Sequence, residues 1–154
     1  MATTPDDLST LYFYGHVQSV ITSYGNGHCD APRGSAIRVD ATVLRNPPAD
    51  PAVRDQMLHS TGLDPAVRSY VMATPGAADL VRRHAERVRA LLHHEQLLHR
   101  RTGGQRHRVD VHVACAGGRH RSVAIAEELA VHLRSVGIGC EVEHLHINRP
   151  ILQQ

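Results

Sequence analysis

The chain contains no lysine and no tryptophan, and all 17 of its basic residues are arginine. A Walker A loop is therefore excluded, because that motif requires a lysine beside the β and γ phosphates of a nucleotide. Catalysis through a lysine Schiff base is excluded for the same reason. Aromatic residues make up only 3% of the sequence, so the core must be built from leucine, valine, isoleucine and alanine.

The sequence also lacks the features of a secreted or membrane protein. No run of about 20 apolar residues is present, which is the length that a membrane-spanning helix requires. The polar start of the chain, with Asp6 and Asp7, does not fit a secretory signal peptide, so we expect a cytoplasmic protein without a membrane partner. Cys29, Cys115 and Cys140 have no paired spacing and indicate free thiols. No histidine or cysteine pair has the spacing of a zinc motif, and we expect no metal and no cofactor.

The length of 154 residues fits one domain, since single domains of about 100–150 residues bury enough surface to fold independently. A hydrophobic content of 42% is ordinary for a globular protein, and a net charge of +2 is too small to indicate nucleic-acid binding by itself. We expect an irregular N-terminal segment over residues 1–16, an α/β domain over 17–148 and a C-terminal tail over 149–154.

Apolar periodicity predicts strands that alternate with helices. Residues 46–63 are rich in proline and predict a long connection, after which Asp64 caps a short helix that starts at Pro65. The expected strands cover residues 17–24, 36–43, 109–115 and 140–146, and the expected longer helices cover 77–100 and 120–136. This alternation predicts a mostly parallel sheet with helices on both faces, as in Rossmann-like domains or a phosphofructokinase subdomain.

The segment 113–122 (V-A-C-A-G-G-R-H-R-S) carries the strongest functional signal. It runs from a strand through two glycines into a helix, whose first N–H groups lie at the positive end of the helix dipole. Gly117 and Gly118 permit close approach of a ligand to the backbone. Three cationic donors follow at the helix entrance: Arg119, His120 and Arg121. The pattern predicts an anion site in which Arg121 holds a phosphate through two parallel N–H bonds, and an ordinary strand-to-helix turn is the alternative.

This loop and three further motifs resemble the C-terminal domain of the RapZ family, the RNase adapter proteins. Residues 114–122 stand in the family frame G-C-T-G-G-x-H-R-S, with Ala116 in place of the threonine. The other motifs are Ser23-Tyr24-Gly25, similar to S-F-G; Asp40 to Pro47, similar to D-V-R-x-L-x-N-P; and Thr61 to Asp64, which matches T-G-L-D. The resemblance covers about residues 17–146, without the family's N-terminal P-loop domain. Thr42, Pro48 and Ala116 depart from the family pattern.

The resemblance implies a ligand-sensing module. The family couples a pocket for a phosphorylated amino sugar or a nucleotide sugar to the control of amino-sugar synthesis, in some members through small RNA. We also expect a homo-oligomer. The residues expected to bind the ligand are Asp40, Asn46, Cys115, Ala116, Gly117, Gly118, Arg119, His120, Arg121 and Ser122.

The same loop also fits C-x5-R-S, the signature of cysteine-dependent phosphatases. In that alternative Cys115 is the nucleophile, Arg121 and the loop amides hold the phosphoryl oxygens, and Ser122 assists departure of the thiol. Asp40 and Asp64 are the candidates for the general acid that such an enzyme needs.

A second basic cluster surrounds the glycine-containing segment 102–105. Its arginines, Arg100, Arg101, Arg106 and Arg108, could contact the phosphate backbone of RNA through charge. No aromatic residue is interleaved to stack on bases, and a solvated loop explains the cluster equally well.

Overall fold

The computed structural model describes residues 17–44, 51–102 and 108–150. Its centre is a sheet of four parallel strands in the order β2-β3-β1-β4. The strands are β1 (Ser19–Gly25), β2 (Ile37–Asp40), β3 (Val111–Cys115) and β4 (Cys140–His144). The predicted parallel α/β fold is confirmed.

In the ranges that the structure describes, four α-helices and two short 3₁₀ helices connect the strands. They are η1 (Asn26–His28), η2 (Ala41–Val43), α2 (Pro51–Leu58), α3 (Pro65–Met72), α4 (Ala77–Thr102) and α5 (Arg121–Ser135). Asp64 caps α3 as predicted, because its side chain accepts a hydrogen bond from Ala66 N. The chain leaves α5 through Gly137, whose φ of 83° favours glycine.

Two sequence predictions differ from the structure between β2 and α3. The prediction of a long connection over residues 46–63 is wrong at α2, which begins at Pro51. A proline is compatible with the first position of a helix, where no intrahelical partner for an N–H exists. The strand predicted over 36–43 ends at Asp40, because the Asp40 carboxylate accepts from Thr42 N and starts η2.

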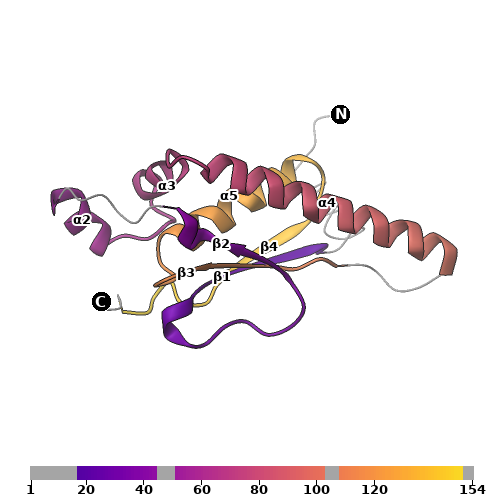
Figure 1. Ribbon diagram of the computed structural model, residues 1–154, viewed down its shortest axis with the longest axis horizontal. Coiled ribbons are helices and arrows are strands. Elements are labelled where there is room, and N and C mark those ends of the chain that lie inside the picture. The colour runs from indigo at the N-terminus through magenta and orange to yellow at the C-terminus, as the bar shows by residue number, and fades with distance from the viewer. Residues whose placement is uncertain (1–16, 45–50, 103–107, 151–154) are drawn as a thin grey trace, which may run out of the picture.

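The two faces of the sheet are covered unequally. Figure 1 shows α3, α4 and α5 along one face, whereas the connection that contains η1 passes across the other. The steps from β2 to β3 and from β3 to β4 run in the same direction across the sheet, and the step from β1 to β2 runs back. Because crossover connections are right-handed, opposite directions place the connections on opposite faces. Among the described elements, the expected second helical face therefore carries only η1 and its connection.

The core lies between the sheet and α5. Ile21 and Val113 from the sheet pack with Ile125, Leu129 and Leu133 of α5, and all five are fully buried. The helix that apolar periodicity predicted over residues 120–136 is thus confirmed. Its burial fixes the angle of α5 to the sheet, and with it the position of the helix entrance beside β3.

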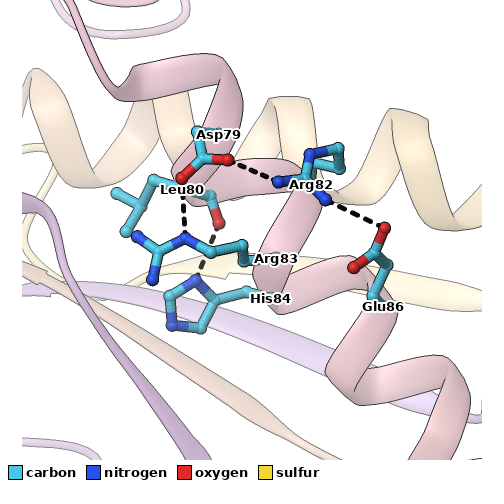
Figure 2. Close-up of polar contacts among 6 residues, drawn as sticks. All are labelled: Asp79, Leu80, Arg82, Arg83, His84 and Glu86. Carbon is cyan, nitrogen blue, oxygen red and sulfur yellow. Dashed lines mark hydrogen bonds and ion pairs between the residues drawn. The ribbon is translucent and has the colours of Figure 1, made fainter.

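Helix α4 has 26 residues and packs beside α5. Ala85, Val88 and Leu92 face inward, and an exposed ladder of ion pairs faces outward (Figure 2). In the ladder Asp79 pairs with Arg82 at 2.5 Å and with Arg83 at 2.8 Å. The Arg82 hydrogen bond lowers the pKa of Asp79. Within the described part of the chain, no helix is both long and apolar enough to cross a membrane.

Cys29, which follows η1, adopts a left-handed backbone conformation with φ 53°. That conformation costs a residue with a Cβ about 1–2 kcal/mol, and glycine, which avoids this cost, loses about 0.5–1 kcal/mol more conformational entropy on folding. We expect Cys29→Gly to raise the free energy of unfolding by up to about 1 kcal/mol in urea titrations. Cys29→Ala, which keeps the Cβ, serves as the control. Equal stabilisation by both variants would assign the effect to the thiol rather than to φ.

Candidate anion-binding loop

The segment between β3 and α5 closes around the sulfur of Cys115. The thiol donates to Ser122 Oγ at 3.1 Å, and the sulfur accepts from Gly118 N at 3.2 Å. Gly118 has a φ of 77°, which allows the chain to fold back to the sulfur before α5 begins. The side chains of Cys115 and Ser122 are both buried, so these contacts are part of the interior of the fold.

The end of β1 fixes the loop from the side. An added Cβ on Gly25 would lie 2.5 Å from the carbonyl carbon of Gly117, and one on Gly118 would lie 2.6 Å from Gly25 N. The two backbone segments can touch only because neither carries a side chain at these positions. The predicted position of the loop, at the carboxyl end of the third strand, is confirmed.

The loop carbonyls are bound by neighbouring segments. Ala116 O accepts from Gly27 N at 3.0 Å, Gly117 O from His28 Nε2 at 3.0 Å, and Arg119 O from Gly62 N at 2.7 Å. Helix α5 begins at Arg121, and its N-cap residue, His120, makes no side-chain capping hydrogen bond. The first N–H groups of a helix have no acceptor within it, so this entrance is a positively polarised donor site. These three carbonyls thus accept from the protein, so the loop has mainly N–H donors left to offer to a ligand.

The three cationic side chains of the entrance occupy different positions. Arg121 is buried and donates through Nη1 to Leu44 O at 2.8 Å. Arg119 donates through Nη1 to Arg149 O at 3.0 Å, and its buried Nε finds no acceptor among the described residues. The side chain of Arg121 is therefore partly committed to the protein, whereas Arg119 retains an unsatisfied donor.

His120 turns toward the segment that joins α2 to α3. Its Nε2 lies 2.6 Å from Met57 O and 2.9 Å from Ser60 O, so Nε2 carries the proton and donates to these carbonyls. Burial lowers the pKa of His120, and the charges of Arg119 and Arg121 act in the same direction. The neutral ring therefore has one N–H, which these two carbonyls already share.

Asp40 lies on the other side of the sheet from Cys115. The strand register pairs Asp40 with Ala114, and successive residues of a strand point to opposite faces. Its carboxylate accepts from Thr42 N at 3.0 Å and from Thr42 Oγ1. The structure therefore does not bring Asp40 to Cys115, although both lie near the carboxyl edge of the sheet. Asn46 lies outside the described residues.

Comparison with known proteins agrees with the sequence motifs. The family described as RapZ C-terminal domain matches residues 17–148. A nucleotide-binding protein of Rubrobacter xylanophilus is 43% identical over 129 residues, which are 84% of this chain and 39% of that protein. A nucleotide-binding protein of Leifsonia xyli subsp. xyli is 34% identical over 134 residues, or 86% of this chain and 42% of that protein. The chain belongs to the RapZ C-terminal domain family. It spans about two fifths of the length of these curated relatives.

This RapZ C-terminal domain holds its loop with two histidines that the sequence analysis did not assign to the site. His146 Nδ1 accepts from Gly25 N at 2.9 Å, and the ring of His28 lies 4.7 Å from that of His146. Arg149 and Asp30 join the same cluster. His28 and Asp30 lie more than 100 residues from His146 and Arg149 in the sequence, so no local spacing could have revealed the cluster.

His144 serves a different network in the domain. Its Nδ1 lies 2.6 Å from Ser23 Oγ and its Nε2 lies 2.8 Å from Glu127, which ties β1, β4 and α5 together. Ser23 is fully buried, so its hydroxyl is closed to a substrate in this structure. Across residues 17–44, 51–102 and 108–150, no group of three histidine, cysteine or acidic residues could hold a metal ion.

The second basic cluster is only partly within the described residues. Arg108 forms two hydrogen bonds of 2.8 Å with Asp110, so its guanidinium is engaged within the domain. The side chains of Arg100 and Arg101, at the end of α4, and the whole of Arg106 lie outside the description.

The contact of Gly25 with the loop predicts a sharp difference between two alanine substitutions. We expect Gly25→Ala to lower the free energy of unfolding by about 1–3 kcal/mol, because its Cβ would displace the loop backbone. Gly117→Ala has no neighbour within 4 Å of its Cβ and should stay within about 0.5 kcal/mol of the wild type. Urea unfolding of both variants tests this difference. Equal losses would show that the glycines do not act through close packing.

The buried histidine predicts a pH dependence of stability. Because the folded-state pKa of His120 lies below its ordinary value of 6.5, the unfolded chain binds the proton first as the pH falls. Stability from this site is therefore complete above pH 6.5 and declines toward the folded-state pKa. Urea titrations between pH 7.5 and 5 should give a shallower decline for His120→Gln. A residual decline is expected, since burial also lowers the pKa of His112. Identical slopes would remove His120 from this effect.

Proposed function

We propose that the domain senses a phosphorylated amino sugar or a nucleotide sugar, which it binds at the Cys115–Ser122 loop. The observation that supports the proposal is the entrance of α5, which has no side-chain cap, beside a loop in which the carbonyls of Ala116, Gly117 and Arg119 accept from protein donors. A phosphate satisfies such an entrance, because it accepts several N–H bonds and is stabilised by the helix dipole. Arg119, whose buried Nε has no acceptor among the described residues, is proposed to add a charged donor beside this entrance.

The family supports a nucleotide-related ligand. The relatives that cover most of this chain are named nucleotide-binding proteins, although the chain corresponds to only part of each. Within the proposed site, the amides of residues 116–122 other than Gly118, whose N–H donates to Cys115 Sγ, receive the phosphate. Arg119 and Arg121 neutralise it, and His120 contacts a ligand oxygen. Asp40, near the carboxyl edge of the sheet, remains a proposed contact for a sugar hydroxyl, and Asn46 remains a proposed ligand contact.

The geometry supports binding rather than phosphatase activity. Arg121, the arginine of the C-x5-R pattern, directs Nη1 to Leu44 O instead of over the loop. Asp40 lies on the face opposite Cys115, and Asp64 is used as the cap of α3. A phosphatase needs a protonated carboxyl within about 2.6–3.2 Å of the leaving oxygen, and neither aspartate is placed to serve a phosphoryl group on Cys115.

Small RNA is a further proposed partner, through backbone contact with Arg100, Arg101, Arg106 and Arg108. The engagement of Arg108 with Asp110 leaves this contact to the other three arginines. We also propose a cytoplasmic homo-oligomer, in line with the implied coupling to amino-sugar synthesis.

Ligand binding tests the proposal directly. Glucosamine 6-phosphate or a uridine diphosphate amino sugar should raise the melting temperature, since a ligand that binds only the folded state stabilises it. Arg119→Ala should weaken the affinity by about 10- to 100-fold, because a charge-assisted hydrogen bond contributes about 1.5–3 kcal/mol. Isothermal titration calorimetry measures this change.

Arg87→Ala, on the exposed surface of α4, is the control and should bind as the wild type does. The same preparations, and a Cys115→Ser variant, should release no phosphate from a generic aryl phosphate. Cys115-dependent turnover would support the phosphatase alternative. The absence of binding by either sugar phosphate class would rule out the proposed ligand.

A further inference from the structure

We infer that an anion bound at the Cys115–Ser122 loop releases α2 from the entrance of α5, so that α2 reports occupancy of the site. The inference rests on the proposed function and adds the structural change by which the domain responds to the ligand. It concerns the connection between β2 and α3, both ends of which are held by residues 119–121.

Three consecutive residues hold this connection. Arg121 Nη1 donates to Leu44 O at 2.8 Å, near the start of the connection. His120 Nε2 donates to Met57 O and Ser60 O, at the end of α2. The carbonyl of Arg119 accepts from Gly62 N at 2.7 Å. Carbonyl oxygens of the protein thus occupy donors that would otherwise face an anion.

The two cationic side chains respond differently to a ligand. A guanidinium has five N–H donors, so Arg121 can bind an anion and keep the Leu44 carbonyl. A neutral imidazole has one N–H donor, and in His120 that donor is shared by Met57 O and Ser60 O. A ligand oxygen that accepts from His120 must therefore replace these two carbonyls. His120 is the point at which ligand and α2 compete.

Helix α2 is the element that can yield. Met57 is buried, whereas Ala52, Arg54, Asp55 and Leu58 are exposed. Because most of the side chains of α2 that the structure describes are exposed, we expect this helix to open at low cost. The chain beyond it is fixed, because Gly62 fits against the backbone of α5, where its Cβ would lie 2.4 Å from His120 O. The released segment therefore ends between Ser60 and Gly62. Helix α3 stays in place, because Val67 and Val71 are buried in the core.

Competition of this kind is reciprocal. If the ligand weakens the docking of α2, a substitution that weakens the docking must strengthen ligand binding by the same factor. Met57→Ala removes the buried side chain of α2 and leaves its carbonyl and every loop donor in place. Leu58→Ala, at an exposed neighbouring position, is the matched control.

Hydrogen exchange and calorimetry on the full chain test the inference, with glucosamine 6-phosphate as the probe. Saturation with the probe should speed amide exchange in residues 51–60 by about fivefold or more, while exchange in α3 stays unchanged. Met57→Ala should exchange rapidly without the probe and bind it about fivefold more tightly. Leu58→Ala should match the wild type in both measurements.

Binding by the wild type with unchanged or slower exchange in residues 51–60 would overturn the inference and leave the proposed function intact. Weaker binding by Met57→Ala would do the same, because α2 would then be part of the site. The absence of binding by the wild type would overturn the proposed function, and the inference with it.

Discussion

The contact between the end of β1 and the Cys115 loop is the constraint on which the rest of the site depends. Gly25 meets Gly117 and Gly118 backbone to backbone, at distances that leave no space for a Cβ on Gly25 or Gly118. This contact lets His28 reach Gly117 O and lets His146 accept from Gly25 N. Because His28 and neighbouring amides hold loop carbonyls, the N–H groups that start α5 are the main donors of the proposed site.

The buried core supports the same arrangement from below. Ile125, Leu129 and Leu133 hold α5 against β1 and β3, and the Cys115 sulfur lies between the strand end and Ser122. A rigid helix on a rigid sheet places the first turn of α5 at a fixed distance from the strand ends. The adaptable part lies outside this frame, in the connection that the side chains of His120 and Arg121 hold through backbone carbonyls.

A rigid frame with one displaceable connection suits a ligand sensor better than a catalyst. Catalysis by a cysteine requires an acid opposite the thiol, whereas Asp40 points to the other face of the sheet. Sensing requires two arrangements of one element that differ by a few hydrogen bonds. The carbonyls of Met57 and Ser60 provide that second arrangement, because they occupy a donor that a ligand would also use.

Local sequence was enough to predict the parallel α/β class, the place of the loop at the end of β3, the cap at Asp64 and the family. These features follow from local periodicity, from turn residues and from motifs read within a few positions of one another. The helix at Pro51 was missed, because proline at a helix start and proline in a loop look alike in sequence. Other contacts could be found only in the folded domain. Arg121 donates to Leu44 O, and His120 donates to Met57 O at the end of α2. His28 and His146 bind backbone groups of the loop and of the end of β1, and Asp40 points away from Cys115. Each of these depends on strand order and register, which bring together residues that no spacing along the chain relates.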